Sequence, residues 1–341
     1  MKRISLLFLL AVTMARPLLA QYQVGTCNGF AGFATISAAV SSPTVPANST
    51  INICPGTYPE QVIITKPLSL VGIQSGNRRD ITILGQPTYS TILNYQGTLS
   101  EPVVLVEASP VNFANINVSF FAQPAQLSGA PVGIFYASGA SGTVVHSNVW
   151  VYTGSNLFPQ TAGIWIENAD IDLDTVMVSN NTIDTDSIGI WAASVQQPGF
   201  APVLAVTLNA NQFYHQATWG IGIDQATATI QSNVMDSTGG GVYQSSVAID
   251  LNTSAYALVT ANKIINFDYG VAITQSKPTI TNNTFWTTTY GIEFNCYAAT
   301  VTGNTFYGQR GGTTALSNPP LAFSGANTYY NIGSISQTTC P

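Results

Sequence analysis

A short phrase of apolar and small residues recurs between Gly133 and Phe306. Its first half is a Gly-Ile-x-Ile step, in which apolar residues alternate with variable ones. Copies of this step begin at Gly133, Gly163, Gly189, Gly220, Ser246, Gly270 and Gly291, at spacings of 30, 26, 31, 26, 24 and 21 residues. The second half places a bulky apolar residue two positions after an asparagine, as at Asn181, Asn211, Asn262, Asn283 and Asn304. Such a period predicts a solenoid of short repeating units.

The alternation within each copy identifies the kind of solenoid. Apolar residues recur at every second position and are rich in Ile, Val, Phe and Thr, which is typical of strands rather than helices. A leucine-rich repeat is disfavoured because the recurring apolar residue is not leucine. We therefore predict an all-β parallel β-helix, in which equivalent residues of successive coils lie about 4.8 Å apart. The turn asparagines are expected to stack as a ladder of amides.

The chain divides into four segments. The expected boundaries are 1–20 for a signal peptide, 21–50 for an N-terminal cap, 51–310 for the β-helix and 311–341 for a C-terminal tail or cap. The first segment has basic residues, an apolar run and small residues, as secretory signal peptides do, and cleavage after Ala20 is favoured over Ala15. The cap is expected to contain a short helix between Gly29 and Ser41, because apolar residues have helical spacing there.

Charged side chains make up only 7% of the chain, far below the usual quarter. No Lys or Arg lies between Arg79 and Lys263, although acidic residues are present throughout this span. Such a surface disfavours nucleic acid, whose phosphates require basic residues. No stretch after the signal peptide is long and apolar enough to span a bilayer. The sequence predicts a secreted protein, extracellular or periplasmic, that acts as a monomer.

Four cysteines remain after the signal peptide, and an oxidising compartment favours their pairing. Bonds between Cys27 and Cys54 and between Cys296 and Cys340 would each pin one end of the solenoid, although four cysteines allow three connectivities. Metal binding by these cysteines is disfavoured, because no Cys-x-x-Cys pair is present and the two histidines lie far apart.

Three phrases near the start of the repeats resemble a known group. They are Pro-Gly-Thr-Tyr-Pro-Glu at 55–60, Val-Ile-Ile at 62–64 and Lys-Pro-Leu-Ser-Leu-Val-Gly at 66–72. They look like the first coils of the pectin-lyase-like right-handed β-helix superfamily, and with the later repeats the resemblance covers about residues 30–310. It implies a right-handed parallel β-helix. It implies no single activity, because lyases, hydrolases, esterases and proteins without known activity share this scaffold.

The phrases that carry chemistry in those families are missing from the sequence. It has no Asp-Phe-Ile-Phe-Gly or Gln-Asp-Thr as in the methylesterases, and no Gly-His-Gly with Arg-Ile-Lys as in the polygalacturonases. It also lacks the Trp-Ile-Asp-His of the pectate lyases. A lyase of bare polyuronate is further disfavoured, because residues 80–262 include no Lys or Arg to offset the charge of such a substrate.

The outward residues of the Gly-Ile strands should form columns across the coils. One column is expected to read Phe135, Trp165, Trp191, Gly222, Ala248, Ala272 and Glu293. The next is expected to read Ala137, Glu167, Ala193, Asp224, Asp250, Thr274 and Asn295. Aromatic faces suit sugar rings, and small residues would leave a groove. The predicted substrate-binding residues are Phe135, Trp165, Trp191 and Glu293.

The carboxylates of the second column are candidate catalytic residues. Asp224 and Asp250 are expected one coil apart, about 5 Å, which is the separation of acid and nucleophile in retaining glycosidases. Glu167 lies two coils from Asp224, within the range for an inverting pair. The alternative is that loops cover these columns, so that the rings are packed and the acids are merely solvated.

A second acidic group could bind calcium, since oxygen ligands in an exported protein suit Ca²⁺. The candidate ligands are Asp172, Asp174, Asp184 and Asp186. No glycine-anchored calcium loop accompanies them, so a solvated acidic face is the alternative. No other cofactor is expected. His146 and His215 are expected to be hydrogen-bonded turn residues rather than general bases.

The sequence thus predicts an exported single-domain β-helix that binds, and as a glycoside hydrolase cleaves, a neutral or weakly charged extracellular polysaccharide. The alternative is a non-catalytic surface, adhesion or carbohydrate-binding protein, whose neutral Asn, Thr and Ser faces present repeated hydrogen-bonding groups.

Overall fold

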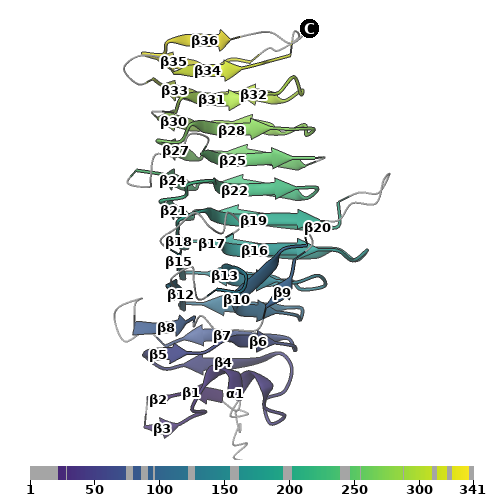
Figure 1. The fold of residues 1–341 in the computed structure, drawn as a ribbon, viewed down its shortest axis with the longest axis vertical. Helices are drawn as coiled ribbons and strands as arrows, with labels where there is room; N and C mark the ends of the chain where they lie inside the picture. Colours follow the sequence, from purple (N-terminus) through teal and green to yellow (C-terminus); the bar gives the residue numbers. More distant parts are fainter. Residues whose placement is uncertain are drawn as a thin grey trace, which may run out of the picture.

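Three parallel β-sheets run along the length of the molecule (Figure 1). The computed structural model describes residues 22–27, 29–73, 80–85, 91–94, 97–121, 127–153, 161–194, 202–238, 246–253, 255–286, 288–308, 313–320 and 325–337. The chain passes from sheet 1 to sheet 2 to sheet 3 and back, and successive coils pair in parallel. The predicted parallel β-helix is confirmed.

The strands are short and, from β4 to β34, fall into the three sheets in rotation. Sheet 1 contains β1 (Tyr22–Val24), β4 (Ser49–Ile53), β7 (Leu68–Gly72), β11 (Val111–Ala114), β14 (Gly142–Val145), β17 (Asp174–Ser179), β20 (Leu204–Asn209), β23 (Thr227–Gln231), β26 (Tyr256–Thr260), β29 (Thr279–Thr281) and β32 (Thr300–Thr302). Sheet 2 contains β5 (Gly56–Pro59), β8 (Ile81–Leu84), β12 (Asn117–Phe121), β15 (Asn148–Tyr152), β18 (Thr182–Thr185), β21 (Gln212–Tyr214), β24 (Val234–Asp236), β27 (Lys263–Ile265), β30 (Thr284–Trp286), β33 (Thr305–Tyr307) and β35 (Thr328–Tyr330). Sheet 3 contains β6 (Val62–Ile64), β10 (Leu99–Val106), β13 (Ala130–Tyr136), β16 (Ala162–Asn168), β19 (Ile188–Ser194), β22 (Trp219–Asp224), β25 (Val247–Asn252), β28 (Tyr269–Ile273), β31 (Tyr290–Glu293), β34 (Thr314–Ser317) and β36 (Ser334–Gln337).

Three further strands lie outside this rotation. β9 (Ile92–Leu93) pairs antiparallel with β10 at one edge of sheet 3. β2 (Thr26–Cys27) and β3 (Phe30–Ala31) form a separate antiparallel pair near the N-terminal end.

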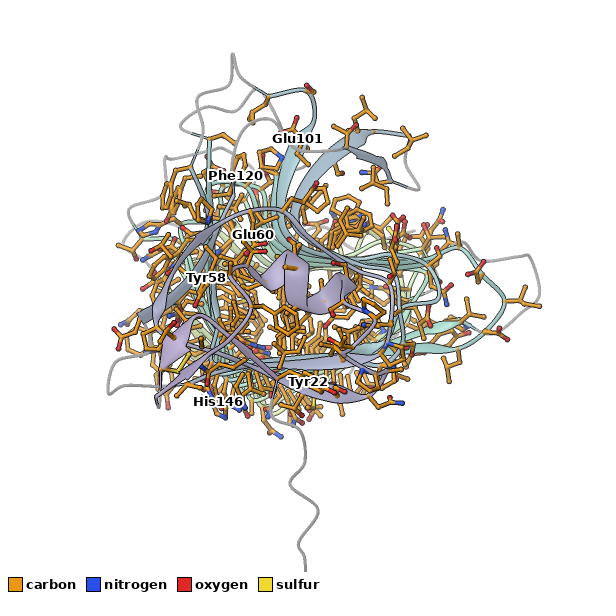
Figure 2. All side chains as sticks on the ribbon, turned by 90° about the horizontal axis from the view of Figure 1, so that it is seen from below. Tyr22, Tyr58, Glu60, Glu101, Phe120 and His146 are labelled. Atoms are coloured by element: carbon orange, nitrogen blue, oxygen red, sulfur yellow. A yellow bond between two sulfur atoms is a disulfide. The ribbon has the colours of Figure 1, made fainter. Side chains whose placement is uncertain are left out.

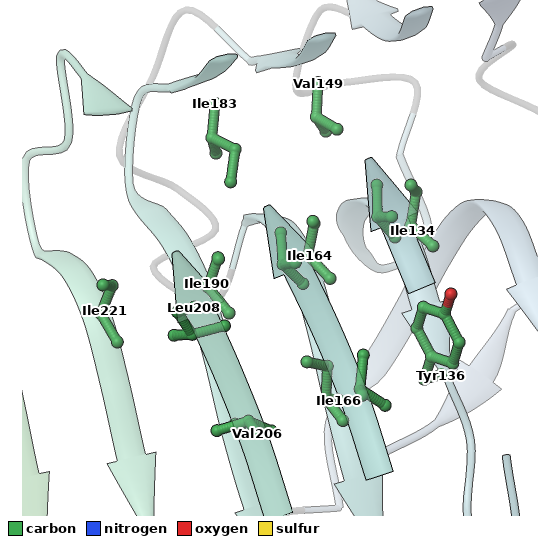
Figure 3. Packing of buried hydrophobic residues seen from close by; sticks show 14 of the residues in the cluster. Ile134, Tyr136, Val149, Ile164, Ile166, Ile183, Ile190, Val206, Leu208 and Ile221 are labelled. Carbon is green, nitrogen blue, oxygen red and sulfur yellow. The ribbon is translucent and has the colours of Figure 1, made fainter. Parts of the chain in front are cut away.

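The core is a set of stacked apolar columns enclosed by the three sheets (Figure 3). Residues two apart in a strand point to the same side, so each Gly-Ile step sends its isoleucines inward. One column consists of Ile134, Ile164, Ile190 and Ile221, which are paired in register and almost fully buried. Burial of each such side chain contributes about 1.5–3 kcal/mol, which explains why the apolar period is maintained through every coil.

The asparagine ladder is confirmed at the turn between sheets 1 and 2. In each step the backbone N–H and the side-chain Nδ2 of one asparagine both donate to Oδ1 of the asparagine in the next coil, as between Asn211 and Asn233 at 2.9 and 3.0 Å. The same Nδ2 also donates to a backbone carbonyl, that of Val178 in the case of Asn211. The ladder contains Asn181, Asn211, Asn233, Asn262, Asn283, Asn304 and Asn327. Asn233 and Asn327 extend the set that the repeat phrase identified.

A short helix, α1 (Ile36–Ser41), covers the first coil (Figure 2). Its residues Ile36, Ala39 and Val40 are buried in the same core as the strands. Thr35 caps its N-terminus, and the Glu60 carboxylate accepts hydrogen bonds from the first two backbone N–H groups of the helix, both at 2.8 Å. These contacts satisfy backbone donors that a helix start leaves free. The predicted capping helix is present, although shorter than the segment expected.

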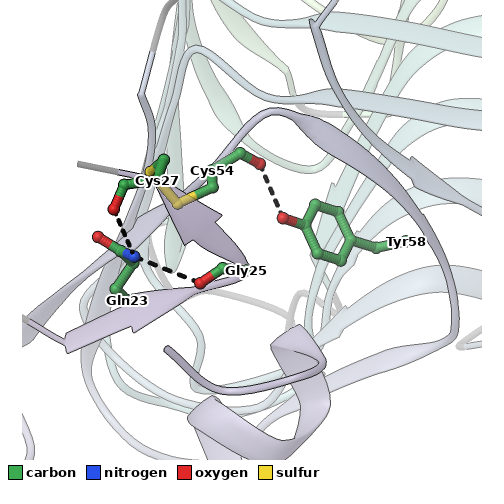
Figure 4. Close-up of a disulfide and its surroundings, with 5 residues drawn as sticks. All are labelled: Gln23, Gly25, Cys27, Cys54 and Tyr58. Atoms are coloured by element: carbon green, nitrogen blue, oxygen red, sulfur yellow. Dashed lines mark hydrogen bonds between the residues drawn. A yellow bond between two sulfur atoms is a disulfide. The ribbon is translucent and has the colours of Figure 1, made fainter. Parts of the chain in front are cut away.

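The N-terminal end is fastened by a disulfide between Cys27 and Cys54, as predicted (Figure 4). Beside it the Tyr58 hydroxyl donates to the Cys54 carbonyl oxygen at 2.7 Å. Cys296 is also disulfide-bonded. Its expected partner Cys340, like the signal peptide at 1–20, lies outside the described residues, so those two expectations remain predictions.

The solenoid extends beyond both of its expected boundaries. β1 pairs with β4, so the first coil begins inside the segment expected to be a cap. β34, β35 and β36 continue sheets 3 and 2 past residue 310, where the sequence predicts a tail. Here Thr, Ser and Tyr replace most of the Ile and Val of earlier coils, while buried Leu316, the stacking of Tyr329 on Phe306 and the ladder residue Asn327 continue the core and the turn. Among the described residues no helix is long and apolar enough to cross a membrane.

Candidate active site on the outer face of sheet 3

Outward side chains of sheet 3 form three adjacent columns along the molecule. The first column contains Ala162, Ile188, Trp219, Val247, Tyr269 and Tyr290. The second contains Phe135, Trp165, Trp191, Gly222, Asp250, Ala272 and Glu293. The third contains Glu167, Ala193, Asp224 and Asn252. The second and third are the two columns predicted from the sequence, with one change of register.

That change moves Asp250 from the third column to the second. The repeat phrase placed Ser246 at the position of the glycine that opens each copy. In the structure Ala248 takes that position opposite Gly220, and Asp250 pairs with Gly222. Ala248 is fully buried and serves as the small inward residue, so the true phrase is Ala-Ile-Asp-Leu. The prediction that Asp224 and Asp250 occupy one column about 5 Å apart is therefore wrong. They are diagonal neighbours, about 8 Å apart at Cα.

The aromatic part of the second column is buried rather than open. Phe135, Trp165 and Trp191 are 0%, 1% and 3% exposed and form a second apolar cluster with Ile92, Ile188 and Trp219 around them. Ring centroids are 6.4 Å apart between Phe135 and Trp165, and 5.9 Å apart between Trp165 and Trp191. Rings stacked along the column give their faces to each other, so these three cannot form the predicted platform for sugar.

Gly222 does not leave a groove either. A Cβ at this position would lie 2.2 Å from the Trp191 ring, so the indole already fills the space above the glycine. Two coils before Gly222, Nε1 of Trp165 donates to Glu167 Oε2 at 3.1 Å, and Glu167 is 7% exposed. Glu167 therefore supports the buried rings. It does lie two coils from Asp224 in one column, as predicted.

The face opens from β22 onward, and we call the section from β22 to β31 the open face. Here Trp219, Tyr269 and Tyr290 in the first column are partly exposed, as are Ala272 and Glu293 in the second. Each open aromatic ring is supported from one side. Trp219 lies against Trp191, with centroids 4.9 Å apart, and Tyr269 stacks on Tyr290 at 5.0 Å. Trp219 and Tyr269 are separated by the small side chain of Val247.

Asp250 is the most perturbed acid of the open face. Its side chain is 8% exposed although it points to the outer side of the sheet. Burial raises the pKa of Asp250 to about 6, the hydrogen bond from Asn252 Nδ2 at 2.7 Å opposes this rise, and the charge of Asp224 adds to it. The two carboxylates therefore interact, and Asp250 carries a proton under mildly acidic conditions.

Neighbouring groups complete the electrostatics of the open face. Glu293 accepts a hydrogen bond from Asn318 Nδ2 at 2.7 Å. The pKa of Tyr269 is raised, first by burial and then by Tyr290, Glu293 and Asp268. An acid with a raised pKa beside a second carboxylate, on a face that also presents aromatic rings, is an arrangement suited to proton donation to a glycosidic oxygen.

The four aspartates predicted to bind calcium do not come together. Asp172 is exposed at a turn, and Asp174 begins β17 in sheet 1, where it accepts hydrogen bonds from the Gly139 N–H and the Ser141 hydroxyl. Asp184 and Asp186 belong to sheet 2 and the turn after it. The predicted strand alternation fails because the chain bends at 170–172. Within the described ranges no three His, Cys, Asp or Glu side chains form a group able to hold a metal.

Two features escaped the sequence reasoning. Asp184 accepts a hydrogen bond from the Tyr152 hydroxyl, and its Oδ1 lies 2.7 Å from Nδ1 of His215. These contacts join residues from three successive coils on the side of sheet 2. The open aromatic residues were also missed, because Trp219, Tyr269 and Tyr290 precede the repeated glycine and the alternation was counted only after it. An aromatic residue directly before Gly220, Gly270 and Gly291 was the available signal.

Comparisons with known proteins agree with this architecture. Residues 162–327 match a family described as "Right handed beta helix region". The fold is thus a right-handed parallel β-helix, as the resemblance of the first coils implied. A comparison with curated protein sequences gives no match.

Solved structures share the fold at low sequence identity. A lacto-N-biosidase from Eubacterium ramulus is similar at a TM-score of 0.56 and 10% identity, over 93% of this chain and 67% of that one. An alginate lyase from Paenibacillus sp. str. FPU-7 is similar at 0.50 and 12% identity, over 94% and 99%. The ORF18 protein of Geobacillus virus E2 is similar at 0.52 and 13% identity, over 84% of this chain, which spans only 56% of the viral protein.

Proposed function

We propose that the protein is exported, binds a neutral or weakly charged extracellular polysaccharide on the open face and hydrolyses its glycosidic bonds. Asp250 acts as the general acid, and Asp224 acts as the carboxylate partner that serves as nucleophile or base. Two proteins that share the fold are named as carbohydrate-acting enzymes, a lacto-N-biosidase and an alginate lyase. The proposal itself rests on the residues of this chain.

The observation that carries it is the environment of Asp250. Isolated carboxylates on a sheet surface are normally solvated, whereas Asp250 is nearly buried, with a pKa raised to about 6 and a second carboxylate beside it. A carboxyl group with a raised pKa beside a second carboxyl group is what acid-assisted glycoside cleavage requires. The acid protonates the leaving oxygen while the ionised partner attacks the sugar or activates water.

The sugar ring is proposed to lie above Val247, between the side chains of Trp219 and Tyr269. These two residues are two coils apart, about 10 Å, which is twice the usual stacking distance and leaves room for one flat ring between them. Their far sides are occupied by Trp191 and Tyr290. Val247 and Asp250 belong to the same strand, so a ring held in this position lies next to the acid.

A scarcity of basic residues selects the kind of polysaccharide. The described strands of the open face contain Asp224, Asp250 and Glu293 but no Lys, Arg or His. These carboxylates would repel a polyanionic glycan, whereas a neutral glycan meets no electrostatic repulsion at this face.

The test is release of reducing sugar by the purified protein from a panel of neutral and acidic plant and microbial polysaccharides. We expect activity on a neutral member, lost in Asp250→Asn and retained in the control Glu107→Gln, which removes an exposed carboxylate at a turn. Val247→Phe should abolish binding with both acids in place, and Val247→Thr should preserve it. Binding without any release of sugar, equal in Asp250→Asn, would instead establish a non-catalytic binding protein.

A further inference from the structure

The outer face of sheet 1 is uncharged over its eleven strands. The eleven strands of sheet 1 contain one ionisable residue, Asp174. Its side chain is 4% exposed and accepts a hydrogen bond from the turn at Gly139, away from this face. All outward positions carry hydroxyl, amide or apolar side chains. The absence of charge is specific to this sheet, since the outer faces of sheets 2 and 3 carry Asp184, Asp236, Lys263 and Asp224 among others.

The polar groups of this face are arranged in straight rows. One column contains Thr143, Met177, Thr207, Thr229, Leu258, Thr279 and Thr300, and the next contains Ser179, Asn209, Gln231, Thr260, Thr281 and Thr302. Neighbours in a column repeat at about 4.8 Å. Thr281 donates to the Thr260 hydroxyl at 3.2 Å, so some hydroxyls are ordered by the adjacent coil.

Large apolar side chains are exposed on the same face, Met177 and Leu258 within the first of these columns and Tyr256 beside it. Tyr256, Leu258 and Met177 are 58%, 41% and 39% exposed. A threonine-rich face could simply be solvated, but a solvated face has no need to exclude charge or to expose large apolar groups. Depletion of charge together with exposed aromatic and Met side chains is the composition of a binding surface.

We propose that this face adsorbs the protein onto the flat surface of an insoluble, neutral polysaccharide. Threonine, asparagine and glutamine both donate and accept hydrogen bonds, as sugar hydroxyls do, and the methyl and aromatic groups cover the apolar faces of sugar rings. An uncharged face avoids the desolvation cost that buried charges would incur against a neutral solid. The stacked coils hold these groups in fixed positions, so little side-chain ordering opposes adsorption.

The choice of polysaccharide as the ligand rests on the proposed function, but the surface is separate from the open face. Sheet 1 would hold the protein on the solid, while sheet 3 would act on a chain. The two roles can therefore be tested independently.

The experiment measures adsorption isotherms on particles of cellulose, chitin and insoluble β-glucan, in the Asp250→Asn background so that the solid is not degraded. The test variant is Thr229→Lys with Thr281→Lys, both on sheet 1. The matched control is Thr284→Lys with Thr305→Lys, which adds the same charge on the outer face of sheet 2. Circular dichroism and the melting temperature check that each pair folds.

We expect the sheet 1 pair to weaken adsorption to at least one solid by tenfold or more, and the sheet 2 pair to change it by less than twofold. With Asp250 restored, both pairs should cleave soluble oligosaccharides at the wild-type rate. Equal adsorption by both pairs, or no adsorption by the wild type, would overturn the proposal. So would light scattering that shows a wild-type dimer and a monomeric sheet 1 pair, because the face would then join two copies. Loss of soluble cleavage in every form would count against the proposed function alone.

Discussion

Replacing Asp250 by Asn should stabilise the protein at neutral pH, because the folded state holds this carboxyl in a site that disfavours its charge. Burial raises the pKa of Asp250 from 3.8 to about 6. A difference of this size corresponds to about 3 kcal/mol between the protonation states. The substitution retains the shape of the side chain and an oxygen able to accept from Asn252, while it removes the charge.

The sign of the effect follows from proton linkage. Below about pH 4 Asp250 is protonated in both the folded and unfolded states, and its contribution to stability is fully present. Between about pH 4 and pH 6 the unfolded chain ionises this carboxyl while the folded protein still holds its proton, so that contribution is lost by the time the pH has risen through about 6. The wild type should therefore lose up to about 3 kcal/mol relative to Asp250→Asn between pH 4 and pH 8.

The assay is urea unfolding of the wild type, Asp250→Asn and Asp172→Asn at pH 4, 6 and 8. Asp172 is an exposed residue at a turn, so its substitution makes the same change of formal charge away from the open face. Contributions of all other groups cancel when each variant is compared with the wild type at the same pH. A stability difference between the wild type and Asp250→Asn that does not change with pH would refute the reasoning, as would an equal pH dependence for Asp172→Asn.

Three substitutions test the scaffold by the same urea unfolding measurement. Asn233→Ala should cost about 3 kcal/mol or more, because it leaves buried ladder groups without partners; a loss below 1 kcal/mol would contradict the ladder. Gly222→Ala should cost about 1–3 kcal/mol, since its Cβ would overlap the Trp191 ring; Ala272→Ser is the control, and equal effects would contradict this packing. Cys27→Ser with Cys54→Ser should cost about 3–4 kcal/mol, because the disulfide closes a separation of 27 residues; unchanged stability would show that it is not needed.

The sequence was sufficient for the architecture because the solenoid repeats its physical requirements. Each coil needs inward apolar residues at period two and a turn amide that bonds to the next coil, and these needs appear as Gly-Ile-x-Ile and as asparagine. The register was predicted wrongly in one copy, where two alignments of the small inward residue fit the repeat equally well. Ser246-Val247-Ala248-Ile249 can be aligned on Ser246 or on Ala248, and only the packing of the small inward side chain decides between them.

The site was predicted less well, because exposure depends on contacts between distant segments. A column of aromatic residues has the same pattern whether it is open to solvent or covered, and Trp165 and Trp191 are covered. The raised pKa of Asp250 likewise results from burial and from Asp224 in the preceding coil, and neither can be read from a strand in isolation. The columns placed Asp224 and Asp250 on the outer face of sheet 3 but gave the wrong relative position, and their catalytic role stays a prediction.

The most direct test of the account is a crystal structure of the Asp250→Asn protein with an oligosaccharide of the polysaccharide it degrades or binds. We expect a sugar ring above Val247 between Trp219 and Tyr269, with a glycosidic oxygen within hydrogen-bond distance of residue 250 and the Asp224 carboxylate near the anomeric carbon. An oligosaccharide bound elsewhere, with the open face in contact only with solvent, would contradict it.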